Sequence, residues 1–411
     1  MASRHDVAVV GAGPGGAATA YFLAARGLDV LLLDRASFPR DKTCGDGLTP
    51  RALRVLDDMG VLADAAALGR PVGGYEVVAP NGRATRAAMP RAPGVPDFAL
   101  VVRRRRLDAL LVERAVAGGA TFQPRFAVAG IEREPGGVRL VGDSGGRAAA
   151  AHARVAVVAT GASAALLKAT GLLPRFPRTM LAARAYLEGT PRLLGQLQLR
   201  FDAAPLPGYG WVFPVSDTTA NVGVGYLPTR RSPPTTRAAL ERFLQHRPLR
   251  TMLDGARMAA APRSYPIRVD FLTAPTVGDG LLLVGEAAGL VNPLTGEGID
   301  YALESGRLAA EHIAAMIVAG DLSAARLKAY DRLLRVHYAP LFRFCAQVSH
   351  WCLRAPLLNV LVALANRRAD LRLLLANVVL GNRPISGRGQ LGSWLKRSSL
   401  PAAPGTLSCR L

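Results

Sequence analysis

Short apolar runs separated by glycine-rich turns dominate the start of the chain. Val7 to Val10 leads into the turn Gly11 to Gly16, and an alanine-rich segment continues to Arg26 before a second apolar run, Val30 to Leu33. Short apolar runs bounded by turn residues are typical of buried strands, and the segment between them is long enough for a helix. The pattern predicts a strand, a helix and a second strand beside the first in a parallel sheet.

Two later apolar runs extend this predicted sheet. Val155 to Val158 is followed by Thr160 and Gly161, and Leu281 to Val284 is followed by Gly285. Because each run is short, apolar and closed by a small turn residue, both are expected to be further buried strands of the same sheet. Residues 50–70 have apolar positions at helical spacing and are expected to be helical.

From about residue 175 to 270 apolar and polar positions alternate, which predicts an antiparallel sheet. The expected strands are 182–187, 197–201, 210–214 and 221–226. On the strand that ends at Pro214, alternation puts Tyr209, Trp211 and Phe213 on one face as an apolar wall. The neighbouring glycines, Gly208 and Gly210, are expected to leave room for a guest molecule, and packing of the rings into the core is the alternative.

These patterns predict an α/β protein with a discontinuous Rossmann-type domain on a parallel sheet, an inserted antiparallel-sheet domain and a C-terminal helical region. The Rossmann-type domain is expected to comprise residues 1–72, 100–172 and 272–335, and the antiparallel-sheet domain residues 73–99 and 173–271. The helical region is expected at 336–396 and a flexible tail at 397–411.

Composition narrows the class of protein. Of the 411 residues, 50% are hydrophobic and 20% charged, which is typical of a folded globular protein. The formal net charge of +21 is compatible with nucleic-acid or anionic-membrane binding, but an excess of arginine over lysine is also typical of a GC-rich genome. Arg103 to Arg106 precedes apolar residues at helical spacing and is expected to be the solvated start of a helix. No nucleic-acid partner is expected.

The four cysteines, Cys44, Cys345, Cys352 and Cys409, lack CxxC spacing, so neither a disulfide framework nor a metal site is expected. This usage fits a reducing cytoplasm, and the N-terminus has no signal-peptide pattern. The longest uncharged apolar window near the end, Ala355 to Asn366, is well short of the ~20 residues that span a bilayer.

The part of the chain after Val336 is apolar, helical in pattern and strongly basic. It contains ten Lys or Arg residues and one acid, Asp370. Apolar residues from Leu341 to Leu375 alternate with arginines, which suits helices that lie on an anionic membrane surface. A peripheral contact with the inner face of the cell membrane is therefore one expectation, and ordinary core helices with solvated arginines are the other.

The turn Gly11 to Gly16 and Asp34 together have the arrangement of a dinucleotide-binding unit. In such a unit the glycines admit a pyrophosphate, and the acid at the end of the second strand binds a ribose hydroxyl. Strand, glycines, helix, second strand and acid all occur in register, which makes the signal far stronger than the glycine motif alone.

Two further glycine-rich segments carry candidate chemistry. The loop Phe38 to Leu48 holds Cys44 among glycines, with basic neighbours that favour a thiolate or an anionic ligand, and a buried inert thiol is the alternative. In Gly285 to Gly306, Gly296 and Gly298 bracket Glu297 directly before an apolar helical pattern. The free N–H groups at such a helix start can bind a phosphate or an electron-rich ring.

Taken together, these motifs resemble the geranylgeranyl reductase family, a group of flavoproteins built like aromatic-ring hydroxylases, over nearly all of residues 5–395. The segments CGDGLTPRA, PGYGWVFP and NPLTGEGIDY are most similar to the branch that reduces the polyprenyl tail of menaquinone. The resemblance implies FAD as the cofactor. It implies FAD contacts from Gly11, Gly13, Pro14, Gly16, Asp34, Arg35, Cys44, Gly45, Arg104, Thr160, Gly161, Gly285, Glu286, Pro293, Thr295, Gly296, Glu297, Gly298 and Ile299.

The same resemblance implies reaction-site roles for Cys44, Asp46, Tyr209, Trp211 and Phe213. The expected reaction is saturation of C=C bonds in an isoprenoid lipid, with hydride from flavin N5 and a proton from Cys44 or a nearby water. Glu286 departs from the family, which usually has Asp there, so its contact with the flavin ribityl chain is an open point. No second glycine-rich dinucleotide unit is evident, so an external donor, NAD(P)H or a ferredoxin-like reductant, is expected.

Two competing functions remain open at this point, and a third, a halogenase, is disfavoured. A flavin monooxygenase acting on a hydrophobic small molecule would share the glycine turn, Asp34 and the segment around Gly296. A halogenase would be expected to carry a WxWxIP-type segment, which is absent from the sequence. A non-catalytic polyprenyl carrier could use the aromatic strand but would not need a complete dinucleotide site.

Overall fold

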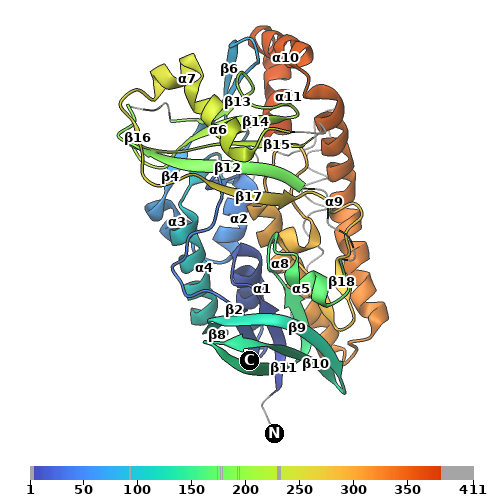
Figure 1. The fold of residues 1–411 in the computed structure, drawn as a ribbon. Helices are drawn as coiled ribbons and strands as arrows, with labels where there is room; N and C mark the ends of the chain where they lie inside the picture. The colour runs from blue at the N-terminus through green and yellow to red at the C-terminus, as the bar shows by residue number, and fades with distance from the viewer. Residues whose placement is uncertain are drawn as a thin grey trace, which may run out of the picture.

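A computed structural model describes residues 4–380 apart from 92–93, 174, 176, 178, 192, 194 and 229–232. Two large sheets lie one beyond the other along the length of the molecule, and helix α9 runs beside both of them (Figure 1). The predicted C-terminal tail, 397–411, and residues 381–396 lie outside the described part of the chain.

The first sheet is parallel at its centre, as the apolar runs predicted. Its strands follow the order β18-β19-β11-β1-β2-β8. It is extended by β10, which pairs antiparallel with β11, and by β9, which pairs antiparallel with β10. The strands are β1 (Arg4–Val10), β2 (Val30–Asp34), β8 (Thr121–Pro124), β9 (Phe126–Glu134), β10 (Gly137–Ser144), β11 (Arg147–Val158), β18 (Val277–Gly278) and β19 (Leu281–Leu283). All five residues of β2 are buried, which a parallel strand covered on both faces requires.

The second sheet is almost entirely antiparallel, in the order β16-β12-β15-β14-β13-β5-β6, with β17 on β12. Its strands are β5 (Gly74–Val78), β6 (Ala84–Ala88), β12 (Thr179–Glu188), β13 (Leu197–Arg200), β14 (Gly208–Pro214), β15 (Thr219–Tyr226), β16 (Arg257–Met258) and β17 (Arg263–Arg268). Only the β5–β13 pair is parallel among these pairings. Strand β5 comes from an earlier part of the chain than β13, its parallel neighbour. A small third sheet joins β3 (Gly47–Leu48), β7 (Ala99–Val101) and β4 (Arg70–Val72).

Helices cover the sheets and connect them. They are α1 (Pro14–Ala24), α2 (Pro50–Asp58), α3 (Leu62–Leu68), α4 (Arg104–Ala117), α5 (Ala165–Ala169), α6 (Thr236–Gln245), α7 (Arg247–Met252), α8 (Ile299–Val318), α9 (Ala324–Cys352), α10 (Ala355–Arg367) and α11 (Ala369–Val379), with the 3-10 turn η1 (Gly285–Ala288). The helical pattern predicted over 50–70 is confirmed, but it forms two helices, because Gly60 has a positive φ of 70° and separates α2 from α3.

Two of these helices, α1 and α8, approach each other closely. A Cβ on Gly306 of α8 would lie 2.5 Å from the carbonyl oxygen of Gly15 in α1. The glycine at 306 therefore lets the two helices that begin at the predicted cofactor segments pack directly against each other.

The C-terminal helices divide between the core and the surface. Leu341 and Phe342 of α9 are 3% and 1% exposed, so this part of the predicted interfacial region is core, which favours the alternative for α9. Helix α9 also continues through position 336, so the domain division there stays a prediction. In the described residues no single helix is long and apolar enough to cross a membrane. Helices α9 and α10, which are bent against each other, meet the length and composition criteria for a span only as a pair.

Candidate active site

A cavity of about 760 Å³ lies where the two sheets meet. It extends from the β1–α1 turn to the aromatic strand β14 and the start of α8. Among the residues predicted for the site, those that line it are Gly11, Gly13, Pro14, Asp34, Arg35, Cys44, Gly45, Asp46, Arg104, Thr160, Gly161, Tyr209, Trp211, Phe213, Gly285, Glu286, Thr295, Gly296, Glu297, Gly298 and Ile299. Gly16 and Pro293 are absent from the cavity wall.

The turn between β1 and α1 is too tight for any side chain at two positions. Gly11 has a φ of 103°, and a Cβ there would lie 2.5 Å from the carbonyl oxygen of Ala159. A Cβ on Gly16 would lie 1.8 Å from the carbonyl oxygen of Gly11. Gly16 thus acts by allowing the turn to close beneath the cavity, which explains why it does not line the wall.

Asp34 at the end of β2 is held by the same turn. Its carboxylate accepts hydrogen bonds of 2.8 Å from the backbone N–H of Ala12 and of 2.8 Å from that of Ala36. The side chain is 8% exposed and lines the cavity, so an acid stands beside the glycine turn where a ribose hydroxyl would be recognised.

Two arginines converge near the start of α1. Arg104 makes a bidentate pair of 2.7 and 2.8 Å with Asp108, which is fully buried, and Arg40 lies 3.0 Å from the same carboxylate. Guanidinium nitrogens of Arg40 and Arg104 lie 3.7 and 3.9 Å from the position of a Cβ on Gly13. Helix α1 has no side-chain cap, so free N–H groups and two cations point at one place, which suits a pyrophosphate.

The cavity fits a bound FAD at both ends. The glycine turn, Asp34 and the two arginines suit the adenosine diphosphate half. At the other end, Oε2 of Glu297 is buried without a hydrogen-bond partner, and Gly298 begins α8 without a side-chain cap. A buried acceptor and open helix N–H groups are both explained by a polar ring bound against them. Among the described residues no cluster of His, Cys, Asp and Glu could hold a metal ion.

The loop that carries Cys44 is anchored to the antiparallel sheet at Asp46. Asp46 is fully buried with a φ of 65°, and its carboxylate accepts bonds from the Tyr186 hydroxyl at 2.6 Å and the Asn221 amide at 2.9 Å. The same Asn221 amide donates to the Cys44 carbonyl at 2.8 Å, and its oxygen accepts from the Trp211 indole at 3.0 Å. Burial raises the pKa of Asp46, and the bonds from Tyr186 and Asn221 oppose that rise.

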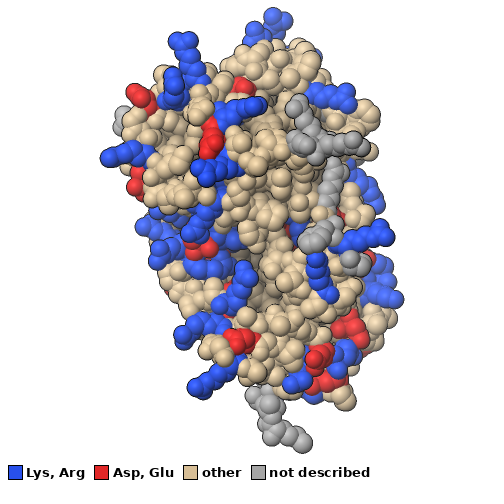
Figure 2. Space-filling model, viewed as in Figure 1, with Lys and Arg blue, Asp and Glu red and all other residues tan. Residues whose placement is uncertain are grey.

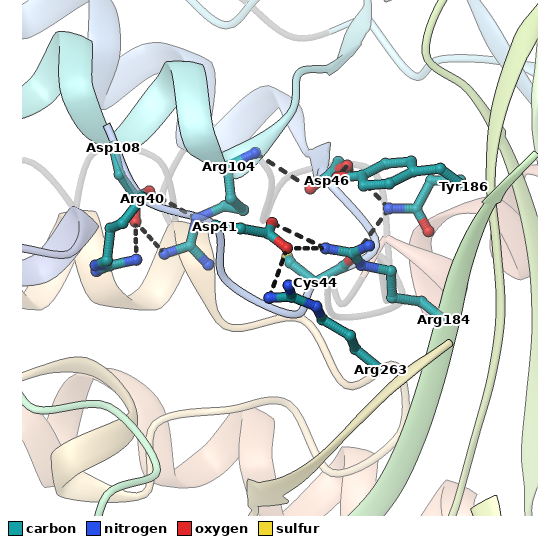
Figure 3. A network of polar contacts seen from close by, with 10 residues as sticks. Arg40, Asp41, Cys44, Asp46, Arg104, Asp108, Arg184, Tyr186 and Arg263 are labelled. Carbon is teal, nitrogen blue, oxygen red and sulfur yellow. Dashed lines mark hydrogen bonds and ion pairs between the residues drawn. The ribbon is translucent and has the colours of Figure 1, made fainter. Parts of the chain in front are cut away.

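A second anchor lies at Asp41 (Figure 3). Arg184 of β12 donates two 2.9 Å bonds to the Asp41 carboxylate, and Arg263 of β17 lies 3.0 Å from it. The Arg184 guanidinium also stacks on the Tyr186 ring at 4.1 Å, which connects the two anchors. The Cys44 loop belongs to the first part of the chain, but the second sheet fixes its position.

The Cys44 thiol lies on the cavity wall between these anchors. Burial raises the pKa of the thiol, which keeps it protonated near neutral pH, while the positive charge of Arg104 opposes the rise. A protonated thiol beside a cation can release a proton and leave a stabilised thiolate.

The aromatic face predicted on β14 forms a continuous wall. Ring centroids lie 6.3 Å apart for Tyr209 and Trp211 and 6.4 Å apart for Trp211 and Phe213, and all three rings line the cavity. Trp211 is 7% exposed because its indole lies over the glycines of β15: a Cβ on Gly223 would be 2.2 Å from the ring. The glycines of the motif after the aromatic strand therefore make space for a tryptophan.

The expectation that Gly208 and Gly210 leave room for a guest was wrong. A Cβ on Gly210 would lie 2.3 Å from the ring of Phe243 in α6, and one on Gly208 would lie 2.3 Å from the carbonyl oxygen of Gly225. Glycines alternate with the rings and so occupy the opposite face of the strand, where protein atoms already fill the space.

Glu286 keeps its side chain on the cavity wall. Its Oε1 accepts a 3.0 Å bond from the Arg268 backbone N–H, and its Oε2 lies 3.6 Å from the Cβ position of Gly161. Burial raises the pKa of Glu286, and Lys42 opposes that rise. Lys42 lies over the Tyr265 ring at 3.1 Å, and burial lowers its pKa to about 8. The longer acid is therefore held by the backbone of β17.

At the start of α8, Glu297 is held in a closed turn. The Asn292 N–H donates to the Glu297 carbonyl at 2.8 Å, and the Asn292 side chain accepts from Leu294 N–H at 2.9 Å. Tyr209 donates its hydroxyl proton to the Thr295 carbonyl, which joins the aromatic strand to this turn. Burial raises the pKa of Glu297 well above its usual range, and the neighbouring Asp300 raises it further.

Several residues that position this site carry no signal in the sequence. Arg184, Tyr186 and Asn221 lie on strands of the second sheet, and their partners are on the Cys44 loop. Arg268, 1% exposed, bonds to Asp270 and to the Ala287 carbonyl and so ties β17 to η1. Polar residues inside strand patterns could have been noted as exceptions, but no pattern indicates their partners.

Comparisons with known proteins agree with this geometry. Residues 4–339 match the family described as FAD binding domain. The chain is 34% identical to a menaquinone reductase of Mycolicibacterium smegmatis over 93% of this chain and 92% of that protein. It is 31% identical to digeranylgeranylglycerophospholipid reductase 1 of Methanopyrus kandleri, over 84% and 90% of the two chains.

Solved structures share the fold. A geranylgeranyl bacteriochlorophyll reductase-like protein from Thermoplasma acidophilum has a TM-score of 0.78 at 23% identity and covers 88% of this chain and 91% of its own. A flavin-dependent brominase has a TM-score of 0.75 at 19% identity, over 96% and 98% of the two chains. The chain belongs to the FAD-binding-domain family, with FAD as its cofactor, and within that family to the geranylgeranyl reductase group of oxidoreductases.

Proposed function

We propose that the protein is an FAD-dependent reductase that saturates C=C bonds in the polyprenyl chain of an isoprenoid lipid, with a menaquinone side chain as the leading substrate. The observation that carries this proposal is the wall of Tyr209, Trp211 and Phe213 beside the Cys44 loop, on the same cavity as the FAD-binding residues. Relatives named as menaquinone and digeranylgeranylglycerophospholipid reductases support it.

An isolated trisubstituted C=C bond has no polar group to activate it. Protonation of the less substituted carbon would leave positive character on the more substituted carbon, and bound, reduced FAD would supply the hydride that this carbon accepts. The faces of Tyr209, Trp211 and Phe213 can stabilise this charge by ~0.5 to 2 kcal/mol for each favourable contact. The Cys44 thiol is the proposed proton source for the other carbon, and Arg104 would stabilise the thiolate left behind.

The electrons come from an external reductant, NAD(P)H or a ferredoxin-like protein. The sequence offers one glycine-rich dinucleotide unit, at Gly11 to Gly16, and the proposed FAD occupies it. A transient donor that reduces the flavin through the open side of the cavity meets this requirement.

Monooxygenation of a hydrophobic molecule is the competing function, since flavin-dependent brominases and related enzymes share the fold. The two functions differ in their need for oxygen. The test is anaerobic incubation of dithionite-reduced enzyme with menaquinone and, separately, with geranylgeranyl diphosphate, followed by mass spectrometry. A gain of two hydrogens for each bond is expected. Products that form only in air and gain oxygen would replace the proposal with the monooxygenase.

A further inference from the structure

The end of α9 and the helices α10 and α11 expose an unusual set of large apolar side chains, called here the C-terminal apolar face. Their exposed fractions range from 38% to 60%. The residues are Trp351, Leu357, Val360, Leu364, Leu373 and Leu374. Leu357, Val360 and Leu364 recur at intervals of three and four residues, so they form one stripe along α10.

This stripe is the outer face of a helix whose inner face is firmly docked. Leu358 and Val362 of α10 are 4% and 1% exposed. The Asn359 side chain accepts a 3.0 Å bond from Asn81 N–H, and the Asn366 amide donates a 2.8 Å bond to the Ala84 carbonyl on β6. The apolar stripe is therefore held outward by contacts near both ends of the helix.

Basic residues surround the apolar face. Arg343, Arg354 and Arg367 are exposed, and the Arg354 guanidinium lies 5.5 Å from the centre of the Trp351 ring. Asp370 is the only acid in the described residues after Val336, and Arg368 pairs with it at 2.6 Å. Figure 2 shows tan surface flanked by blue side chains where Figure 1 places α10 and α11.

The face also lies beside the sheet that carries the aromatic wall. Helices α10 and α11 pack on β6, and β6, β5, β13 and β14 are successive neighbours in one sheet. The Tyr75 hydroxyl on β5 donates to the Arg372 carbonyl of α11 at 3.4 Å. Whatever the face binds is held on the sheet that lines the proposed substrate cavity.

We propose that the C-terminal apolar face docks the protein on an anionic lipid bilayer, with the arginines at the headgroups and the leucine stripe of α10 among the upper acyl chains. The combination of an apolar stripe and surrounding cations matches such a surface, and the inner leaflet of the cell membrane is anionic. The proposal rests on the proposed function, because a polyprenyl lipid reaches the enzyme from a membrane.

The test is flotation of the full chain with its FAD on vesicles of phosphatidylcholine alone or mixed with phosphatidylglycerol. Strong binding to the anionic vesicles is expected, weakening in high salt. The variant Leu357→Ser with Val360→Ser and Leu364→Ser should lose most of this binding. Arg354→Gln and Arg367→Gln should each weaken binding about five-fold, because one basic residue near the surface contributes ~1 kcal/mol.

Val318→Ser is the matched control, since Val318 on α8 is 88% exposed but lies outside the face. It should float like the unaltered protein, and equal melting temperatures would show that every variant is folded. Equal flotation of the triple serine variant would overturn the proposal. So would the absence of binding to anionic vesicles, or gel filtration showing that the face joins two copies of the chain in place of lipid.

The docking proposal and the proposed function can be tested independently of each other. Reduction of a detergent-dispersed substrate should be unchanged in the triple serine variant, while reduction of substrate embedded in anionic vesicles falls with the loss of flotation. Flotation without any reductase activity would support the docking proposal and contradict the proposed function.

Discussion

The β1–α1 turn and the Cys44 loop line the same cavity and come from the same part of the chain, but they are held in different ways. The turn is closed by near neighbours in sequence, such as the Ala12 N–H bond to Asp34, 22 residues away. The Cys44 loop is held by Arg184, Tyr186 and Asn221, which are 140 to 177 residues from their partners. The bond from Ala12 to Asp34 is therefore encoded locally, whereas the position of the reactive loop depends on assembly of the second sheet.

The largest effect should come from a substitution that disrupts the β1–α1 turn. Gly16→Ala would place a Cβ 1.8 Å from the Gly11 carbonyl oxygen, a backbone atom that cannot move aside without opening the turn. Complete loss of bound flavin is expected, measured by absorbance after gel filtration. Gly73→Ala, where no atom lies within 4 Å, is the control and should stay yellow. A yellow Gly16→Ala protein would contradict the account of the turn.

Replacement of the Cys44 thiol should lower turnover without affecting cofactor binding at the β1–α1 turn. Cys44→Ala removes the proposed proton donor but none of the groups that hold the β1–α1 turn. Bound FAD should be retained while turnover falls about 100-fold or more, the usual contribution of a general acid. Steady-state rates at saturating substrate test this, and unchanged turnover would remove Cys44 from the mechanism.

The anchor of the Cys44 loop should matter for both stability and rate. Asp46→Ala leaves the Tyr186 hydroxyl and the Asn221 amide without their buried acceptor and puts alanine at a φ of 65°. Destabilisation of about 3 kcal/mol is expected for a buried charged acceptor lost in this way. Urea unfolding measures it, with Asp217→Ala, an exposed acid at 92%, as control. Equal stability of the two variants would show that the anchor is not needed.

A pair of neighbouring glycines tests the support of the aromatic wall. Gly223→Ala would place a Cβ 2.2 Å from the Trp211 ring, whereas Gly225→Ala would meet that ring at an ordinary 3.7 Å. Overpacking of this kind costs about 1 to 3 kcal/mol, so Gly223→Ala should lower both melting temperature and turnover. Gly225→Ala should change neither by much. The reverse order would mean that Trp211 lies elsewhere in solution.

The smallest effect concerns Lys42. Burial lowers its pKa from 10.5 to about 8, so between these values the unfolded chain binds more protons than the native one. The free energy of unfolding of the flavin-free protein should therefore gain a rising contribution from about pH 8 to 10.5, absent below pH 8 and lost in Lys42→Met. Urea midpoints of the two proteins across this range measure the difference. Parallel curves would contradict burial of Lys42.

Much of the fold could be predicted from the sequence, because strand and helix periodicities are local. The parallel strands, the antiparallel strands and the ring-bearing face of β14 follow directly from spacing. The roles of individual glycines were harder to predict. Gly210 was wrongly expected to leave space, since the sequence cannot show that Phe243 of α6 fills it. Likewise, no pattern links Asp41 to Arg184, because this contact forms only when the two sheets meet.

The most direct test of the central claim is a single turnover without oxygen. Enzyme whose FAD has been reduced and freed of excess reductant is mixed anaerobically with a menaquinone that carries an unsaturated tail, while flavin absorbance and product mass are followed together. The account predicts that the yellow colour returns as one C=C bond is saturated for each flavin reoxidised, and that Cys44→Ala slows this return. Flavin that stays reduced with the lipid and reoxidises only when oxygen is admitted would contradict it.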